Sequence, residues 1–211
     1  MIRELLRSLK ADARFYAALG AHGRNPTTLR VLVTALTNRG LWFLTFHRIA
    51  YTCQASPRRR NLAWWLLRFA QRAGRYLGAV LCKSEILSDC AITGPVYLSS
   101  KGLYVFGAQN VGAGSVIHHR VTFGMAATIG KPERPTIGTD VWIGPDCVIA
   151  GKLHVGDGAT ILPGTYLTSS VPPRSVVKGN PARVMLESFD NAVLRSSLEI
   201  VTELPAPQNS G

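Results

Sequence analysis

The chain has 211 residues, enough for one or two domains with a buried core. Its formal net charge of +12 comes from the first part, because residues 1–85 carry 15 Lys and Arg against 3 Asp and Glu, whereas residues 86–211 carry 9 of each. No helix-turn-helix, zinc-binding or base-stacking motif accompanies this charge, so nucleic acid is not an expected partner. The four cysteines show no close pairing and indicate a reducing, cytoplasmic compartment.

The first part of the chain is predicted to be helical, with helices at about 1–16, 28–54 and 61–82. The first helix has leucines on one side and basic residues elsewhere, and it lacks the apolar run of a secretory signal. Thr27 or Thr28 is the expected cap of the second helix. Its apolar stretch is cut by Asn38 and Arg39 and is too short to span a membrane.

Basic and aromatic side chains mixed on helices are typical of proteins that lie in the interface of an anionic bilayer. We therefore predict that residues 1–84 place the protein on the inner face of the cytoplasmic membrane. The alternative is a helical domain whose aromatic residues pack on one another while the arginines are solvated.

A second pattern begins further along the chain, where one position in six is apolar. These positions are Val111, Ile117, Phe123, Ile129, Ile137, Ile143, Ile149, Val155, Ile161 and Leu167. A smaller residue often stands four positions later, as at Ser115, Cys147 and Ala159. A period of six predicts a coil with three flat faces, in which each face contributes two inward side chains and glycine permits the corners.

The period is interrupted twice. It slips by one residue at Ser99-Ser100-Lys101-Gly102, and two extra residues separate Ile129 from Ile137. We expect the segment 130–136 to project as a loop, which either completes a site or is a plain excursion. The period is lost after about residue 186, where a short helix within 187–203 and a disordered tail are expected. These patterns divide the chain into a helical domain, a coil and a C-terminal segment, at 1–84, 85–185 and 186–211.

Two adjacent histidines stand out within the coil. His118 and His119 occupy positions where other units carry Gly, Ala, Asp or Thr. Because imidazole accepts a proton near neutral pH, this pair is the candidate general base. Neighbouring residues of an extended unit point to different sides and do not supply three metal ligands, so no metal is expected. The alternative is that both rings pack at a subunit boundary.

Three segments carry more specific motifs: 117–124 (IHHRVTFG), 135–144 (PTIGTDVWIG) and the ending 171–184 (VPPRSVVKGNPARV). They resemble the hexapeptide-repeat acyltransferases, in particular serine acetyltransferases and their exopolysaccharide-associated relatives. The resemblance covers roughly residues 86–185. It implies a left-handed parallel β-helix preceded by a helical domain, acetyl-CoA as acyl donor, and a homotrimer whose pairing into a hexamer is left open.

The chain departs from the serine acetyltransferase pattern at two places. That family carries a catalytic His one coil before the pair, where this chain has Ser99-Ser100, and histidine again in the loop that here reads Glu133-Arg134. Sugar-modifying relatives place their catalytic His at the third position of a unit, which His119 matches. The resemblance therefore implies acetyl transfer to a sugar hydroxyl of a polysaccharide or its lipid-linked precursor. Serine O-acetyl transfer and a non-catalytic scaffold are the alternatives.

The resemblance also implies roles for individual residues. His119 is the expected general base, with His118 as the second choice, and the N–H of Gly124 would steady the oxyanion. Glu133 and Arg134 either contact the acceptor or are solvated loop charges. The expected walls of a pantetheine groove between neighbouring β-helices are Trp142, Gly144, Ala150 and Gly151, and the expected phosphate partners are Lys178 and Arg183. Packing between subunits is an equal alternative for Trp142.

Overall fold

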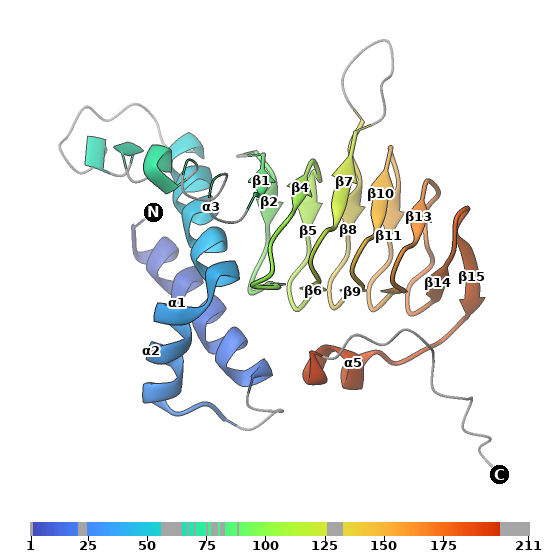
Figure 1. The fold of residues 1–211 in the computed structure, drawn as a ribbon, viewed down its shortest axis with the longest axis horizontal. Coiled ribbons are helices and arrows are strands. Elements are labelled where there is room, and N and C mark those ends of the chain that lie inside the picture. The colour runs from blue at the N-terminus through green and yellow to red at the C-terminus, as the bar shows by residue number, and fades with distance from the viewer. Residues whose placement is uncertain are drawn as a thin grey trace.

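The computed structural model describes residues 2–20, 25–55, 65–125 and 133–198, apart from residues 67, 70, 75, 77–79, 81, 82 and 88. Three helices come first: α1 (Ile2–Leu19), α2 (Thr28–Thr37) and α3 (Arg39–Ala55). The helix predicted at 61–82 falls largely outside the described residues, but those described between 65 and 80 are helical. The helices stand at one end of a row of short strands (Figure 1).

The second predicted helix is in fact two helices. Asn38 has an extended backbone (φ −89°, ψ 109°) between α2 and α3, and its Oδ1 accepts the N–H of Leu41 at 3.2 Å, which caps α3. Thr27 caps α2 as predicted, by accepting a backbone N–H at 3.3 Å. The break lets Gly40 approach the carbonyl of Leu98 so closely that any side chain there would collide with it.

Fifteen short strands follow in the described residues, and they form three sheets. The first sheet contains β1 (Glu85–Ile86), β4 (Val105–Phe106), β7 (Thr122–Gly124), β10 (Val148–Ala150) and β13 (Tyr166–Leu167). The second contains β2 (Ala91–Ile92), β5 (Asn110–Val111), β8 (Thr136–Ile137) and β11 (His154–Val155). The third contains β3 (Tyr97–Leu98), β6 (Val116–Ile117), β9 (Trp142–Ile143), β12 (Thr160–Ile161), β14 (Val176–Lys178) and β15 (Arg183–Leu186).

The chain visits the three sheets in turn, which makes the strands a three-sided parallel coil. Paired strands are parallel throughout, except that β15 runs antiparallel to β14. Each turn lies about 4.8 Å above the previous one, the ordinary strand spacing. The predicted order of helices followed by a parallel coil is confirmed, and the left hand of the coil stays a prediction.

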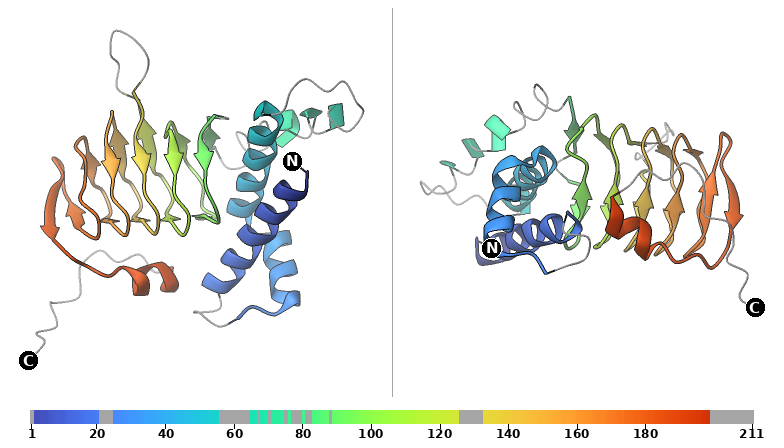
Figure 2. Two further views of the ribbon diagram at one scale, coloured as in Figure 1. Left: turned by 180° about the vertical axis from the view of Figure 1, so that it is seen from behind. Right: turned by 60° about the horizontal axis from the view of Figure 1, so that its bottom comes forward.

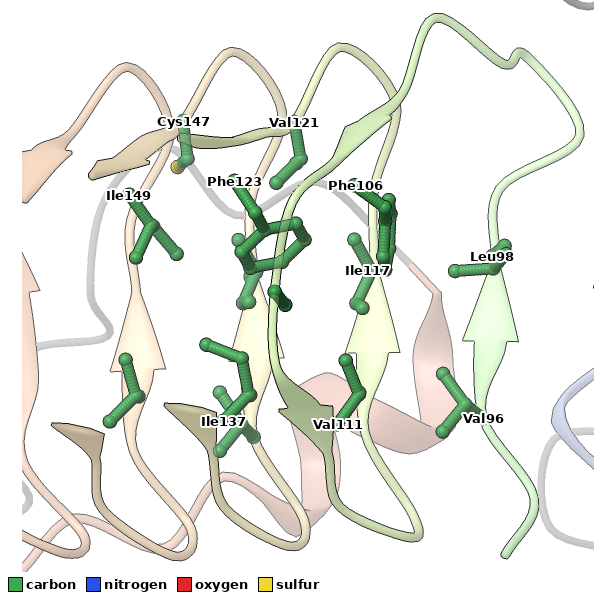
Figure 3. Packing of buried hydrophobic residues seen from close by; sticks show 14 of the residues in the cluster. Val96, Leu98, Phe106, Val111, Ile117, Val121, Phe123, Ile137, Cys147 and Ile149 are labelled. Carbon is green, nitrogen blue, oxygen red and sulfur yellow. The ribbon is translucent and has the colours of Figure 1, made fainter. Parts of the chain in front are cut away.

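The inward positions predicted from the six-residue period form the core (Figure 3). Their exposed fraction is at most 1 % at Val111, Ile117, Phe123, Ile137, Ile143, Ile149, Val155, Ile161 and Leu167. Ile129 lies outside the described residues. Burial of one such side chain contributes about 1.5–3 kcal/mol. Cys147 also points inward as predicted, and burial raises the pKa of its thiol to about 12, so it is a packing residue.

The helices close the first end of the coil. Tyr16, Leu41 and Leu44 belong to the same buried cluster as Leu98 of the coil. The hydroxyl of Tyr16 accepts the N–H of Leu98 at 2.7 Å and donates to its carbonyl at 3.1 Å. The hydrophobic core is therefore continuous across residue 84, and the domain boundary placed there stays a prediction.

The opposite end of the coil is closed by the hairpin of β14 and β15. The chain then returns along the coil as α5 (Ala192–Ser197), which contacts α1 (Figure 2). This is the short helix expected within 187–203. Within the described part of the chain, every helix is too short or too polar to cross a membrane.

Candidate functional site

The strand register stacks one corner of every turn into a column, which we call the histidine corner (residues 99–104, 118–121, 144–147 and 162–165). In the third sheet, one inward column runs through Leu98, Ile117, Ile143, Ile161 and Val177. Side chains alternate along a strand, so the residue that follows each of these points outward. The outward column consists of Ser99, His118, Gly144, Leu162 and Lys178. The histidine pair therefore lies one turn above Ser99 and Ser100.

His118 is buried and neutral. It is 4 % exposed, and its ring packs on the indole of Trp142 with 4.9 Å between ring centres. Burial, followed by electrostatic interactions with His119 and Lys101, lowers the pKa of His118 to about 4. Its Nε2 has no hydrogen-bond partner among the described residues. A covered imidazole is poorly placed to meet a substrate hydroxyl in this conformation.

His119 is half-buried and reaches solvent at the corner. Its pKa is lowered, first by burial and then by Lys101 and Arg120, while Asp146 opposes the shift. The imidazole is therefore mostly neutral at pH 7 and can accept a proton. Arg120 and Asp146 form an ion pair at 2.6 Å one turn apart, and the N–H of Asp146 donates to the carbonyl of His119 at 3.3 Å. These contacts hold the backbone of the corner in place.

Lys101 is a site residue that sequence reasoning missed. It lies one turn below the histidines and is close enough to lower the pKa of both. In the sequence, Lys101 is noticeable only as part of the slip in the repeat at residues 99–102. One full turn here is 19 residues, the offset between Leu98 and Ile117. Counting by turns, and not by units of six, would have placed Lys101 beside the histidine pair.

A second corner gathers five of the predicted site residues, and we call it the loop corner (residues 107–109, 124, 125, 133–135 and 150–153). These residues are Gly124, Glu133, Arg134, Ala150 and Gly151; Ala150 is in register with Gly124. Glu133 pairs with Lys152 at 3.0 Å, and Arg134 pairs with Asp89 at 2.7 Å. Both loop charges therefore have partners within the chain.

The two corners lie on either side of β7. His119 precedes this strand and Gly124 ends it. Within one chain the ring of His119 and the N–H of Gly124 therefore lie at different corners, and the oxyanion role of Gly124 stays a prediction. Glu133 and Arg134 are separated from the histidines in the same way. A site that uses both corners needs a second copy of the chain.

Trp142 lies on the outer side of the third sheet but is 0 % exposed. Leu19 of α1 and Leu194 of α5 pack over it. Its role in this conformation is therefore packing, the alternative we left open, although within the chain and not between subunits. Gly144 beside it is also buried, and a side chain there would meet the nitrogen of Pro163 at 2.8 Å. Neither residue forms an open groove wall here.

Lys178 and Arg183 are exposed and stand opposite each other in the hairpin of β14 and β15. His118 follows β6 and Lys178 ends β14, which lies three strands further along the third sheet. Three strand spacings separate the two residues by roughly 14 Å along the coil. These two cations are accessible to an anionic ligand that lies along the histidine corner. In the part of the chain that the structure describes, no three His, Cys, Asp or Glu residues are grouped to hold a metal ion.

Comparison with known proteins relates the repeat to transferases. Residues 134–169 match the family described as bacterial transferase hexapeptide (six repeats). A chloramphenicol acetyltransferase of Agrobacterium fabrum is 41 % identical over 64 residues, which are 30 % of this chain and 31 % of that protein. A serine acetyltransferase of Bacillus pumilus is 26 % identical over 166 residues, 78 % of this chain and 72 % of the relative. The chain thus spans less than a third of the chloramphenicol acetyltransferase.

The fold is similar to a crystal structure of Neisseria gonorrhoeae serine acetyltransferase in complex with serine. The TM-score is 0.67 at 22 % identity, and the match covers 87 % of this chain and 70 % of that chain. At this identity the likeness concerns the fold. It agrees with the six-residue period and with the three-sided coil closed by helices. We conclude that residues 134–169 carry the hexapeptide repeat of bacterial transferases, and that the chain is similar to serine acetyltransferases and other acetyltransferases.

Proposed function

We propose that the protein is an acetyl-CoA-dependent O-acetyltransferase in which His119 is the general base. The observation that carries this proposal is a mostly neutral imidazole at a solvent-reaching corner of a coil whose relatives are named acetyltransferases. His118, the second candidate, is covered in this conformation. His119 is thus the histidine of the pair that an acceptor can reach.

The proposed reaction is direct transfer. His119 takes the proton of the acceptor hydroxyl as the oxygen attacks the thioester carbonyl, the carbon–sulfur bond breaks, and the imidazolium returns the proton to the CoA thiolate. The products are an ester and CoA. The lowered pKa of His119 keeps the base unprotonated at neutral pH. Lys101 and Arg120, whose charges act on His119, would also stabilise an oxyanion that forms beside it.

The donor would lie along the histidine corner, with its phosphates at Lys178 and Arg183. The separation of these cations from the histidines leaves room for an extended arm between them. Because the histidine and loop corners lie apart in one chain, we infer that the complete site forms between copies of a left-handed β-helix. A homotrimer achieves this with cyclic symmetry, and Gly124, Glu133 and Arg134 of one copy would then face the histidines of another.

Two acceptors have specific support. L-serine is favoured by the comparisons, since the Bacillus pumilus and Neisseria gonorrhoeae proteins are named serine acetyltransferases. A sugar hydroxyl is favoured by the chain's own residues, because Ser99-Ser100 and Glu133-Arg134 stand where the serine acetyltransferase pattern has histidines. The sequence departs from that pattern at both places, so serine transfer would need a different set of contacts.

The test is CoA release from acetyl-CoA with L-serine or with a panel of sugars, for the unmodified chain and for His119→Ala. We expect the substitution to lower kcat/KM by about 10²–10⁴-fold with the preferred acceptor. His154→Ala is the matched control, because His154 is exposed on the second sheet, and it should leave the rate unchanged. If His119→Ala transfers acetyl groups as fast as the unmodified chain, His119 is not the general base.

We also propose that the helices hold the protein on the inner face of the cytoplasmic membrane. α2 exposes an apolar stripe of Leu29, Leu32, Val33 and Leu36, and residues 1–85 carry 15 Lys and Arg against 3 Asp and Glu. We expect the protein to sediment with phosphatidylserine-containing vesicles at low salt, and Leu32→Glu to weaken this binding severalfold. Equal sedimentation with purely zwitterionic vesicles, or none with either, would contradict the proposal.

A further inference from the structure

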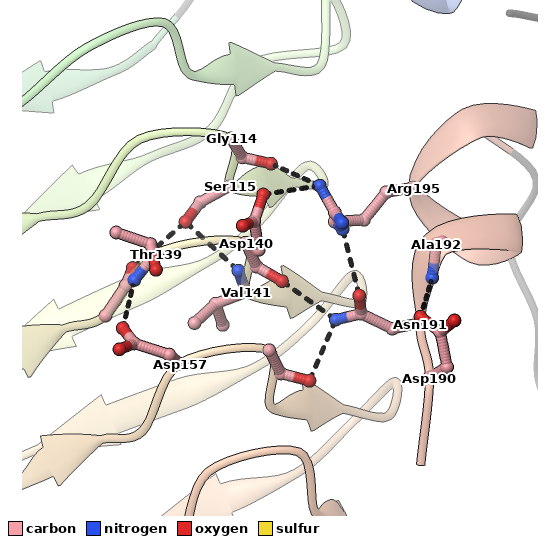
Figure 4. A network of polar contacts seen from close by, with 12 residues as sticks. Gly114, Ser115, Thr139, Asp140, Val141, Asp157, Asp190, Asn191, Ala192 and Arg195 are labelled. Atoms are coloured by element: carbon pink, nitrogen blue, oxygen red, sulfur yellow. Dashed lines mark hydrogen bonds and ion pairs between the residues drawn. The ribbon is translucent and has the colours of Figure 1, made fainter.

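α5 lies on the outer side of the coil and is held mainly by polar contacts (Figure 4). The side-chain N–H groups of Asn191 donate to the carbonyls of Asp140 at 2.9 Å and Gly158 at 3.0 Å. Arg195 pairs with Asp140 at 2.6 Å, and the side chain of Asp140 is 51 % exposed. The buried apolar residue of α5 is Leu194, which is 6 % exposed, and Phe189 and Leu198 on either side of the helix are partly buried against the same cluster. A six-residue helix held by the hydrogen bonds of one asparagine, a half-solvated ion pair and a small apolar contact is short enough to detach as a cover.

Three polar side-chain atoms near this cover have no hydrogen-bond partner among the described residues: Nε2 of His118, Nε1 of Trp142 and Oγ1 of Thr160. We call these three residues the covered cluster. Trp142 links them, because it stands opposite Thr160 in the next strand and its ring packs on His118. All three residues are at least nine-tenths buried. Buried polar atoms normally have partners, so three without one in the same place are groups that a ligand could satisfy.

The chemistry of the covered cluster defines the class of ligand. It offers an indole N–H, a hydroxyl and an imidazole nitrogen on an apolar surface that includes Val116 and Leu162. The cluster itself contains no formal charge at pH 7, and the nearby Arg195 of α5 is paired with Asp140 of the coil. A neutral molecule with several hydroxyls and an apolar face fits this surface. Free serine does not, since its ammonium and carboxylate would be buried without partners.

We propose that the covered cluster is the binding subsite for a neutral, hydroxylated acceptor such as a sugar, and that α5 moves away when the acceptor enters. The subsite directly adjoins His119 through its neighbour His118, so a bound acceptor can place a hydroxyl at the general base. That the bound molecule is then acetylated rests on the proposed acetyltransferase function. The binding step can be measured without any transfer.

The experiment makes Trp142 the sole tryptophan, by Trp42→Phe, Trp64→Phe and Trp65→Phe in the full chain. We expect low quenching of its fluorescence by acrylamide, and higher quenching after Asn191→Ala and Arg195→Ala release α5. Methyl β-D-galactopyranoside should protect Trp142 saturably and bind more tightly to the released variant. Adding Thr160→Val should weaken this binding about three- to tenfold, the value of one neutral hydrogen bond. Thr136→Val, on the second sheet, is the matched control and should leave the affinity unchanged.

Three results would overturn the proposal: no protection of Trp142 by the galactoside in either chain, the same affinity with and without Thr160→Val, or equal protection by L-serine. If the triple substitution unfolds the chain, calorimetric titration of the galactoside into Asn191→Ala/Arg195→Ala, with and without Thr160→Val, decides the same question. If the chain binds the galactoside but transfers no acetyl group, the subsite proposal stands and the proposed acetyltransferase activity is wrong. If the chain transfers acetyl groups but does not bind the galactoside, the proposed activity stands and the subsite proposal is wrong.

Discussion

Buried polar groups occur in two regions of this protein, and the two regions differ in whether these groups have hydrogen-bond partners. At the junction of helices and coil, Asp12 is 0 % exposed and receives two hydrogen bonds from Arg48, at 3.0 and 3.1 Å. Arg48 also donates to the backbone carbonyls of Ile92 and Gly94. In the covered cluster, by contrast, three buried polar atoms lack partners among the described residues.

The difference indicates which contacts are permanent. A fully satisfied network loses its partners if the helices separate from the coil, so the junction opposes opening. An unsatisfied cluster gains partners when its cover leaves, so the region under α5 favours opening. The junction therefore fixes the scaffold, and the outer face of the third sheet is where a ligand can be exchanged.

The largest expected effect is at the junction. Arg48→Ala leaves the carboxyl of Asp12 buried without its cation, and burial already raises the pKa of Asp12 while Arg48 opposes that shift. We expect the free energy of unfolding to fall by about 3–5 kcal/mol, measured by urea denaturation at pH 7. Arg195→Ala is the matched control, because its partner Asp140 is half-exposed, and it should cost under about 1 kcal/mol. If the two substitutions lowered the free energy of unfolding equally, the junction would be no more firmly held than α5.

The double substitution Asp12→Leu with Arg48→Met sharpens this test. It replaces the buried pair by apolar side chains of similar volume, and such replacements are often neutral or stabilising. We expect it to recover most of the stability lost in Arg48→Ala. A double variant as unstable as the single one would mean that the carbonyl contacts of Arg48, and not the burial of Asp12, hold the junction.

The next effect is a loss of stability in acid. Burial lowers the pKa of both His47, at the junction, and His118, in the covered cluster, to about 4, whereas an unfolded imidazole titrates near 6.5. Between these values the unfolded chain binds more protons, so stability falls as the pH falls from about 6.5 to 4. Each histidine contributes up to about 3 kcal/mol to this loss.

Urea midpoints at pH 7 and pH 5 measure this loss. His118→Leu should flatten the pH dependence while that of His47 remains, and His154→Ala, an exposed control, should leave it unchanged. If removal of His118 leaves the slope as steep as before, its ring is not covered in solution. The covered cluster would then be open without any ligand.

Much of the scaffold follows from the sequence because the coil repeats. The six-residue period identified Ile117, Ile143 and Cys147 as inward, and all three are fully buried. A register of this kind determines inside from outside at every position, since a slip of one residue would turn the apolar side chains to solvent. The outward position of His118 follows from the same alternation.

The arrangement of the site does not follow from the repeat. Trp142 is outward in the repeat yet buried, because Leu19 and Leu194 from segments without the repeat pack over it. The separation of His119 from Gly124 required the order of the three sheets, which apolar spacing alone does not assign to corners. The break at Asn38 was visible only as a cut in an apolar stretch, because helix propensity differs little there and the contact of Gly40 with the coil is tertiary.

The smallest predicted effect distinguishes a buried hydroxyl of the coil that has hydrogen-bond partners from one that has none among the described residues. Ser115 is fully buried, donates to the carbonyl of Gly138 and accepts the N–H of Val141, both at 3.2 Å, whereas the Thr160 hydroxyl lacks a partner among the described residues. Ser115→Ala should therefore lower the free energy of unfolding by about 1–2 kcal/mol, and Thr160→Val, which keeps the shape, should raise it by about 1 kcal/mol. Urea denaturation without any acceptor present measures both. A loss in Thr160→Val equal to that in Ser115→Ala would mean that the hydroxyl is already bonded in the free protein, and α5 would then have no unsatisfied cluster to uncover.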